Sequence, residues 1–571
     1  MSKTMWIGIS AVFPASVFLV LLGYGIFQPA RIDYLFSTLS YYIILGVCIV
    51  WILNALRLYK QSKFSLNRLV LSSWKGLAIC LLIAVSLCSA VKPHFRVLDD
   101  EASLLSVSNS LTREHKAHIV TQAKYSLGRD YIVLEQYVPK RPLLFPFLVH
   151  LTHLVRGQQW QNGFLLNSIL LYACLALVYL ALRSQLDDWG AMAGVLLIMT
   201  NPFFIISARS SGFDFLSTFF FLISFVGVYI FLRKPNSASF GFLWSTLLMF
   251  SHIRYENIYL FALVITFVVI LKACNKEFIR RNIQLLAWTP TLLLPYIWQI
   301  YLSKSFLGDG VVSRAFGLDY LLANTKRFVN NQGDLSSVFD TTLSDFTVPT
   351  AAMLGILMLY LGFRRGLRFD NDANRHFFMF AIVANGIHLL ILLSFYFGDI
   401  TLTHMQRIYL PVFSFLVLTP LLIPWLLAPW INTRHIFVAA AALFILYLPL
   451  SLYPQRTGLF YPDLEYQIGF LRSYNPRTTL VVTTRPVRLS ALGFGAINFD
   501  YANQNKEMLI NDIRAHSFTD VLTFQRLGNH TNVVEDSEQL DAEFLLETMA
   551  TFRTEPNRHM RVSRVSTTLQ K

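Results

Sequence analysis

A long polar loop early in the chain holds residue types that could carry out acid–base chemistry on a phosphate-linked substrate. The loop begins with three acids, Asp99, Asp100 and Glu101, and ends with Lys140 and Arg141 between two prolines. A carboxylate can accept the proton of an attacking hydroxyl or bind a metal ion, and paired cations can hold a phosphate. The loop therefore has candidates for both a general base and a phosphate clamp.

Either aspartate is a candidate base, and either cation is a candidate clamp. The ordinary alternatives are solvated surface acids and cations that extend toward lipid headgroups. Acids at the outer end of a membrane span are more often functional than surface acids elsewhere. Proline restricts the backbone of the residue before it, here Arg141. In an extended segment Arg141 and Lys140 face opposite sides, so we expect one of them to contact the phosphate.

The composition identifies the class of protein. Of 571 residues, 54% are hydrophobic and only 14% are charged, and the mean hydropathy is +0.49. These values indicate a polytopic membrane protein. The net charge of +15 comes from Lys and Arg in short segments between apolar runs, as in cytoplasmic loops, so we do not expect a nucleic-acid partner. The five cysteines lie inside apolar runs without ligand-like spacing, which indicates neither a disulfide framework nor a cysteine-based metal site.

Apolar runs predict about thirteen membrane spans, each long enough to cross about 30 Å of hydrocarbon. They lie near residues 5–27, 39–56, 73–92, 162–183, 189–207, 213–232, 239–252, 256–274, 283–302, 350–363, 376–397, 406–428 and 434–453. Residues 143–155, which include His150 and His153, are too short for a comfortable span, and we interpret them as an interfacial helix on the outer face.

The distribution of cations predicts the orientation. The connector between the second and third spans contains Arg57, Lys60, Lys63, Arg68 and Lys75. Because cytoplasmic loops are rich in such residues, we expect this connector and the N-terminus to be cytoplasmic. The loop at 97–142 and everything after Tyr453 are then extracytoplasmic.

The pattern predicts a mainly α-helical protein with two domains. Residues 1–453 are expected to form a transmembrane helical bundle whose extracytoplasmic catalytic loop, with interfacial helices, covers 97–156. Residues 454–571 are expected to form a soluble α/β domain, because 479–484 and 520–527 have strand patterns and 506–516 has the pattern of an amphipathic helix. The final residues, rich in Arg and Thr, are expected to be weakly ordered.

Three further groups of polar residues are expected in outward turns near the membrane. They are Arg209 with Asp214, Arg254 with Glu256, and Arg407 with Tyr409, and we take all six as candidate substrate-binding residues. Taken singly, each of the first two groups is also explained as an ion pair that closes a tight turn. Arg407 is also explained as an anchor to lipid headgroups. The histidines at 150, 153, 252 and 404 lack metal-ligand spacing, so we interpret them as hydrogen-bonded or interfacial.

Taken in order over residues 73–430, these motifs resemble the GT-C superfamily of membrane glycosyltransferases. Within it they are most similar to the group of protein O-mannosyltransferases and lipid A aminoarabinose (ArnT-like) transferases. The motifs are Asp100-Glu101, Lys140-Arg141-Pro142-Leu143, Gly157, Asn201-Pro202, Arg209, Asp214, Arg254-Tyr255-Glu256 and Arg407-Ile408-Tyr409-Leu410-Pro411.

The resemblance implies a polyprenyl-phosphate-linked sugar donor and transfer of its sugar on the extracytoplasmic side of a bacterial inner membrane. The enzyme would be a hexosyl- or pentosyltransferase acting on a lipid, polysaccharide or protein acceptor. It also implies that the first acid of the Asp-Glu pair is the base or, in metal-dependent members, a metal ligand, and that the cation before proline binds the lipid phosphate. A divalent cation such as Mg²⁺ or Mn²⁺ is compatible with this, but nothing in the sequence requires one. The chain departs from the pattern in having Asp99 before the pair and two spans before the span that leads into the loop.

Two other functions are compatible with many spans and outer arginines. In a transporter or flippase, Asp100, Asp214 and Arg254 would line a path, but the two halves of the sequence show no inverted symmetry of the kind many transporters have. An O-antigen ligase or polymerase of surface polysaccharide is not expected to place an acidic pair directly after an early span. The sequence also favours a lipid-linked donor over a nucleotide sugar, since it contains neither a P-loop nor a dinucleotide fingerprint.

Overall fold

The computed structural model describes residues 13–23, 28–270, 276–307, 315–333, 347–364, 369, 371–401, 405–427, 432–457, 462–528, 533–555 and 558–567. The chain divides into two compact units. The first, here called the helical unit, comprises Met1–His94, Lys140–Phe145 and Phe164–Thr457. The second, the sheet unit, comprises Phe95–Pro139, Pro146–Gly163 and Gly458–Lys571.

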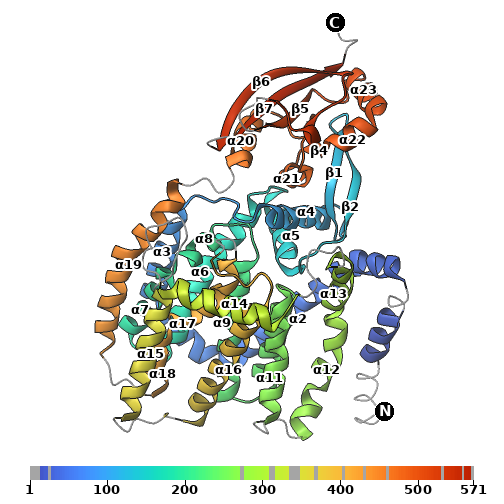
Figure 1. Ribbon diagram of the computed structural model, residues 1–571. Helices are drawn as coiled ribbons and strands as arrows, with labels where there is room; N and C mark the ends of the chain where they lie inside the picture. The colour runs from blue at the N-terminus through green and yellow to red at the C-terminus, as the bar shows by residue number, and fades with distance from the viewer. Residues whose placement is uncertain are drawn as a thin grey trace. The chain divides into compact units, whose positions relative to one another are not determined.

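In its described residues, the helical unit consists of α-helices (Figure 1) with two short 3₁₀ turns. Its elements are α2 (Pro29–Ser72), α3 (Trp74–Ala90), α6 (Asn162–Arg183), α7 (Asp188–Thr200), α8 (Pro202–Ala208), α9 (Asp214–Arg233), α10 (Ser237–Ser251), η1 (Tyr255–Asn257), α11 (Ile258–Ile270), α12 (Lys276–Leu292), α13 (Leu294–Leu307), α14 (Leu318–Gly333), α15 (Thr347–Arg364), α16 (Asp372–Ser394), η3 (Gln406–Tyr409), α17 (Leu410–Leu416), α18 (Thr419–Leu427) and α19 (Thr433–Thr457).

Several of these helices have the length and apolarity to cross a membrane, as expected of an integral membrane protein. Among the described residues, five spans qualify on their own: Pro29–Ser62, Asn162–Arg183, Asp214–Arg233, Asp372–Ser394 and Gln406–Ile423. The pair α7 and α8 qualifies together, although it bends by 79° at the break between them. The expected number of about thirteen spans is not confirmed, because many of the remaining apolar helices are shorter than a bilayer requires.

Two runs that were expected to be single spans are divided into shorter helices, and one expected connector is helical. The run at 283–302 is divided at Leu293 between α12 and α13, with Pro290 in the last turn of α12 and Pro295 in the first turn of α13. Each proline removes a backbone donor and crowds the preceding turn. The run at 406–428 is divided into η3, α17 and α18. The cationic connector after the second span is itself helical, since α2 continues to Ser72.

Helix α9 lies in the interior of the helical unit. It packs against α10, α16 and α17. In its apolar stretch of 18 residues, 67% is buried inside the protein. A helix that is apolar on all sides is typical of such an interior position. Among the five candidate spans, only Gln406–Ile423 is more buried than α9. Asp214 lies in the first turn of α9 and is therefore held inside the helical unit.

Over the residues that the structure describes, the sheet unit contains one seven-stranded sheet with the order β2-β1-β4-β3-β5-β7-β6. The strands are β1 (Ile119–Ser126), β2 (Asp130–Tyr137), β3 (Thr479–Val482), β4 (Gly495–Ile497), β5 (Asp520–Leu527), β6 (Phe544–Glu555) and β7 (Arg558–Thr567). The helices are α4 (Leu98–Glu114), most of α5 (Leu144–Arg156), α20 (Pro462–Leu471), α21 (Pro486–Ala491), α22 (Phe499–Gln504) and α23 (Lys506–Arg514), with a 3₁₀ turn η4 (Asp536–Glu538). Strands β4, β3 and β5 are parallel, and the remaining pairings are antiparallel.

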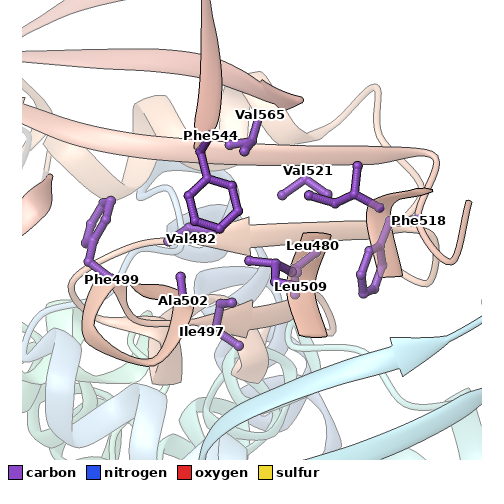
Figure 2. Close-up of a cluster of buried hydrophobic side chains, with 11 residues drawn as sticks. Leu480, Val482, Ile497, Phe499, Ala502, Leu509, Phe518, Val521, Phe544 and Val565 are labelled. Carbon is purple, nitrogen blue, oxygen red and sulfur yellow. The ribbon is translucent and has the colours of Figure 1, made fainter. Parts of the chain in front are cut away.

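One face of this sheet is covered by α22 and α23, and Figure 2 shows the apolar cluster that joins them. Leu480 and Val482 of β3 contribute to this cluster, because alternate residues of a strand face the same side. Val521 of β5 and Leu509 of α23 complete the contact between strand and helix. This alternation is what made β3 and β5 recognisable in the sequence.

The expected α/β character of the C-terminal residues agrees with the structure, but two features were missed. The strands expected at 479–484 and 520–527 and the helix expected at 506–516 correspond to β3, β5 and α23. The expected weak order of the final residues is wrong for Phe544–Thr567, which form the long hairpin of β6 and β7 (Figure 1). Their Thr and Val residues suit strands, and polar side chains are accommodated on an open face. The β1–β2 hairpin, formed by the early loop, was also not expected.

Candidate active site

The three acids of the early loop occupy the first turn of α4. This placement is favourable, because the N-terminal end of a helix carries partial positive charge. Glu101 is buried, and its Oε1 accepts hydrogen bonds from the backbone N–H groups of Arg96 (2.9 Å) and Val97 (3.0 Å). Glu101 thus stabilises the turn that leads into α4.

Asp99 is bound by two arginines of the same unit that sequence reasoning did not single out. Its Oδ1 accepts from the Nε of Arg488 at 2.9 Å and lies 2.8 Å from that residue's Nη2. Its Oδ2 accepts from the Nη1 of Arg485. No local pattern predicts this contact, because the partners are 386 and 389 positions away in the sequence.

Asp100 is half-buried beside this contact. The neighbouring Tyr137 of β2 is a further residue that the sequence did not single out. Burial raises the pKa of the Tyr137 hydroxyl, and the negative charges of Asp99 and Asp100 raise it further. Tyr137 therefore remains a neutral hydrogen-bonding group near the two aspartates.

The basic pair belongs to the helical unit, where its backbone is held by two side chains. The hydroxyl of Tyr255 donates to the carbonyl of Lys140 (2.5 Å), and the Nε2 of Gln299 donates to the carbonyl of Arg141 (2.5 Å). Lys140 is exposed and Arg141 is half-buried. Burial raises the pKa of the nearby Tyr396 hydroxyl, and the positive charge of Arg141 acts against this increase. The backbone of the pair is therefore held in place by Tyr255 and Gln299.

Four of the other predicted site residues meet in one buried ionic network. Asp214 accepts from the Nη1 of Arg254 through Oδ1 and from the Nη1 of Arg407 (3.1 Å) through Oδ2. The Nε of Arg254 donates to Glu256 at 2.5 Å. The side chains of Asp214 and Arg407 are only 5% and 7% exposed. The ion pair expected between Arg254 and Glu256 is confirmed, whereas Arg407 is bound inside the protein and is not an anchor to lipid headgroups.

The bend between α7 and α8 helps place Asp214. Asn201 caps α8 by accepting from the N–H of Phe203 (2.9 Å), and Pro202 takes the first helical position, where its missing N–H has no intrahelical partner to lose. Further along, the Nδ2 of Asn167 donates to the carbonyls of Ser210 and Gly212, each at 2.8 Å. These bonds fix the turn that enters α9.

Arg209 does not pair with Asp214, so the expected ion pair between them is wrong. Arg209 instead donates through Nε to the carbonyl of Val91 (2.8 Å) and through Nη1 to the Oγ of Ser168 (2.6 Å). The physical reason is that both oxygens of Asp214 are already bound by arginines from other turns. Tyr409 is fully buried, and its hydroxyl donates to the carbonyl of Gly398 (2.6 Å).

Three of the four histidines that we interpreted as hydrogen-bonded or interfacial lie in described residues, and all three are buried and hydrogen-bonded. His150 contacts the Oγ1 of Thr112, and His153 contacts the Oγ of Ser108. His252 donates to the carbonyl of Leu292, and His404 lies outside the described residues. In the part of the chain that the structure describes, no three His, Cys, Asp or Glu side chains are grouped to hold a metal ion.

No protein-family model and no curated protein matches the sequence. Among solved structures, this chain is similar to ArnT. The ArnT structure, from Cupriavidus metallidurans and bound to undecaprenyl phosphate, aligns with a TM-score of 0.46 and 10% identity over 86% of this chain and 98% of ArnT. ArnT gives its name to the group that the sequence resembles.

An oligosaccharyltransferase of Archaeoglobus fulgidus, tethered to an acceptor peptide, is also similar. It aligns with a TM-score of 0.45 and 10% identity over 79% of this chain and 69% of the transferase. With TM-scores below 0.5, neither likeness assigns this chain a substrate or an activity.

Proposed function

We propose that this protein is a glycosyltransferase that moves a sugar from a polyprenyl-phosphate donor to an acceptor hydroxyl at the extracytoplasmic face of the membrane. The observation that carries the proposal is the fixed backbone of Lys140 and Arg141 in a unit built from apolar helices. Apolar helices suit the hydrocarbon chain of such a donor, and a preorganised basic pair suits its phosphate.

The buried network supports the same function, because it stabilises the turn that holds the basic pair. Arg254 is tied to Asp214 and Glu256, and the adjacent Tyr255 donates to the carbonyl of Lys140. Ionised side chains inside a membrane protein are costly and are usually retained for function. We assign this network a positioning role, because its two arginines and two acids balance each other in charge.

Asp100 is our proposed general base. Asp100 is half-buried in the first turn of α4, near the neutral hydroxyl of Tyr137, and it is the first acid of the Asp-Glu pair. In the proposed reaction, the acceptor oxygen forms a bond to the anomeric carbon of the sugar and gives its proton to the carboxylate. The bond between that carbon and the phosphate oxygen breaks, and the polyprenyl phosphate leaves with the additional negative charge. A cation that binds this phosphate stabilises the charge as it develops, and the sequence offers Lys140 and Arg141 for that role.

The direct test is transfer by the purified full-length protein in detergent, without a gradient across any membrane. We expect a new glycosidic bond, detected by mass spectrometry, when a set of sugars linked to undecaprenyl phosphate is offered with hydroxyl-bearing lipid, glycan and peptide acceptors. Movement of the donor only in sealed vesicles, with no new bond in either preparation, would contradict the proposal and favour a transporter or flippase.

The basic pair gives a more specific prediction. We expect Arg141→Gln to lower donor-dependent kcat/KM at least about ten-fold, because a charge-assisted contact to the phosphate is worth roughly 1.5–3 kcal/mol. Lys140→Gln should change it little if Lys140 faces water. Arg141 is favoured because it precedes the proline and is the less exposed of the two, and its planar group can bind two phosphate oxygens.

Both variants are compared with wild type at several donor concentrations, and Arg141→Lys tests whether the planar group itself is needed. Equal and small effects of Arg141→Gln and Lys140→Gln would show that this segment does not hold the phosphate. The clamp would then be sought at Arg254 or Arg407.

A further inference from the structure

The sheet unit has a small polar pocket at the carboxyl ends of its parallel strands. It is lined by Thr483, Thr484, Arg485, Arg488, Arg526 and Glu538, among others. Its free volume is about 10 Å³, which is room for about one water molecule. The first four of these residues follow β3, and Arg526 lies near the end of β5.

The topology of the sheet makes this a favourable place for a ligand. The chain passes from β3 to β4 on one side and then returns across β3 to β5 on the other side. The direction of winding therefore reverses between β3 and β5. In open α/β sheets, ligands bind at the carboxyl ends of the strands where this reversal occurs.

Three arginines and two acids line the pocket, so its lining has one surplus positive charge, which Asp99 offsets. Arg526 is matched by the buried Glu538, which lies 3.8 Å from its Nε and accepts from its backbone N–H. Asp463 is the other acid that lines the pocket. Arg485 and Arg488 have Asp99 as their shared partner, and Arg488 is largely buried, with 14% of its side chain exposed. Burial lowers the pKa of Arg488, and the Asp99 carboxylate opposes this.

The contact with Asp99 has the geometry of a bound carboxylate. One oxygen of Asp99 is held by Arg488 and the other by Arg485. The side chain of Asp99 is nevertheless 53% exposed, and that of Arg485 is 49% exposed. Ion pairs this exposed to water are weak, so an external anion can replace Asp99 without a large penalty.

We propose that Arg485 and Arg488 form a binding site for an oxyanion, a phosphate or carboxylate, and that Asp99 is the internal carboxylate that occupies the site when no ligand is bound. We assign the oxyanion to the acceptor molecule, and this assignment rests on the proposed glycosyltransferase function. The binding of an anion at this site does not depend on that function. Because Asp99 directly precedes the proposed base Asp100, a bound anion would also release the first turn of α4 from its contact with the two arginines.

The test is a binding titration of the full-length protein in detergent with inorganic phosphate and, separately, with sodium glucuronate, at constant ionic strength. We expect saturable binding of at least one probe, and the tighter probe identifies whether the site prefers phosphate or carboxylate. Arg488→Gln should weaken binding about ten-fold or more. Asp99→Asn should tighten it several-fold, because the internal competitor loses its charge.

The increase in affinity on Asp99→Asn is the decisive result, since a variant that merely disturbed the fold would bind less tightly. Arg472→Gln, which changes an exposed arginine just after α20 in the same unit, is the matched control and should bind like wild type. Unchanged affinity in both Arg488→Gln and Asp99→Asn, or no binding of either probe to Asp99→Asn, would overturn the proposal. These measurements need no donor, so their failure is distinguishable from failure of the proposed transfer reaction.

Discussion

Replacement of Asp100 by asparagine is expected to lower the rate of sugar transfer by about 10²–10⁴-fold, the usual contribution of a general base. The substitution keeps the shape of the side chain and removes the proton acceptor. The half-buried position of Asp100 at the start of a regular helix should allow the variant to fold. The loss should therefore appear in kcat, with normal expression and an unchanged melting temperature.

Two further variants make this result specific to Asp100. Asp130→Asn changes an exposed acid of β2 in the same unit and should retain wild-type turnover. Asp99→Asn tests the other aspartate, and a larger loss in that variant would move the role of base to Asp99. Near-normal transfer by both Asp100→Asn and Asp99→Asn would exclude the acids of α4 as the source of the base.

Asp214→Asn should destabilise the helical unit by about 3–5 kcal/mol, the range found when one partner of a buried ion pair is removed. The amide keeps the volume of the carboxylate but leaves Arg254 and Arg407 without the charge that both of them contact. Burial makes this loss large, since the Arg407 side chain is only 7% exposed and water compensates little for the lost charge. We expect a clear decrease in the midpoint of thermal or denaturant-induced unfolding in detergent.

The matched control is Asp188→Asn, because Asp188 also lies in the first turn of a helix and also binds an arginine. Its side chain is 63% exposed, and exposed ion pairs contribute about 0–1 kcal/mol. A loss of stability in Asp214→Asn no greater than that in Asp188→Asn would contradict the structural importance of the buried network.

Features that depend only on neighbouring residues were predictable from the sequence. Long apolar runs predict membrane helices, because a helix needs only sufficient length and apolar side chains to replace water by lipid. Strands β3 and β5 were recognisable by composition and alternation, and the ion pair of Arg254 with Glu256 joins residues only two positions apart. Asp99, Asp100 and Glu101 are adjacent in the sequence, so they were recognisable as a candidate site without knowledge of the helix that holds them.

Contacts between distant segments were decided only by the tertiary structure. Asp214 is bound by arginines 40 and 193 positions away, and Asp99 by Arg485 at a separation of 386. A carboxylate has two oxygens, and packing brings Arg254 and Arg407 to those of Asp214. Arg209, although nearer in the sequence, is therefore excluded. The β1–β2 hairpin likewise gains its place in the sheet from a strand more than three hundred residues later, through the pairing of Ala123 with Ala496. Sequence spacing determined which residues were able to do the chemistry, and long-range packing decided which of them meet.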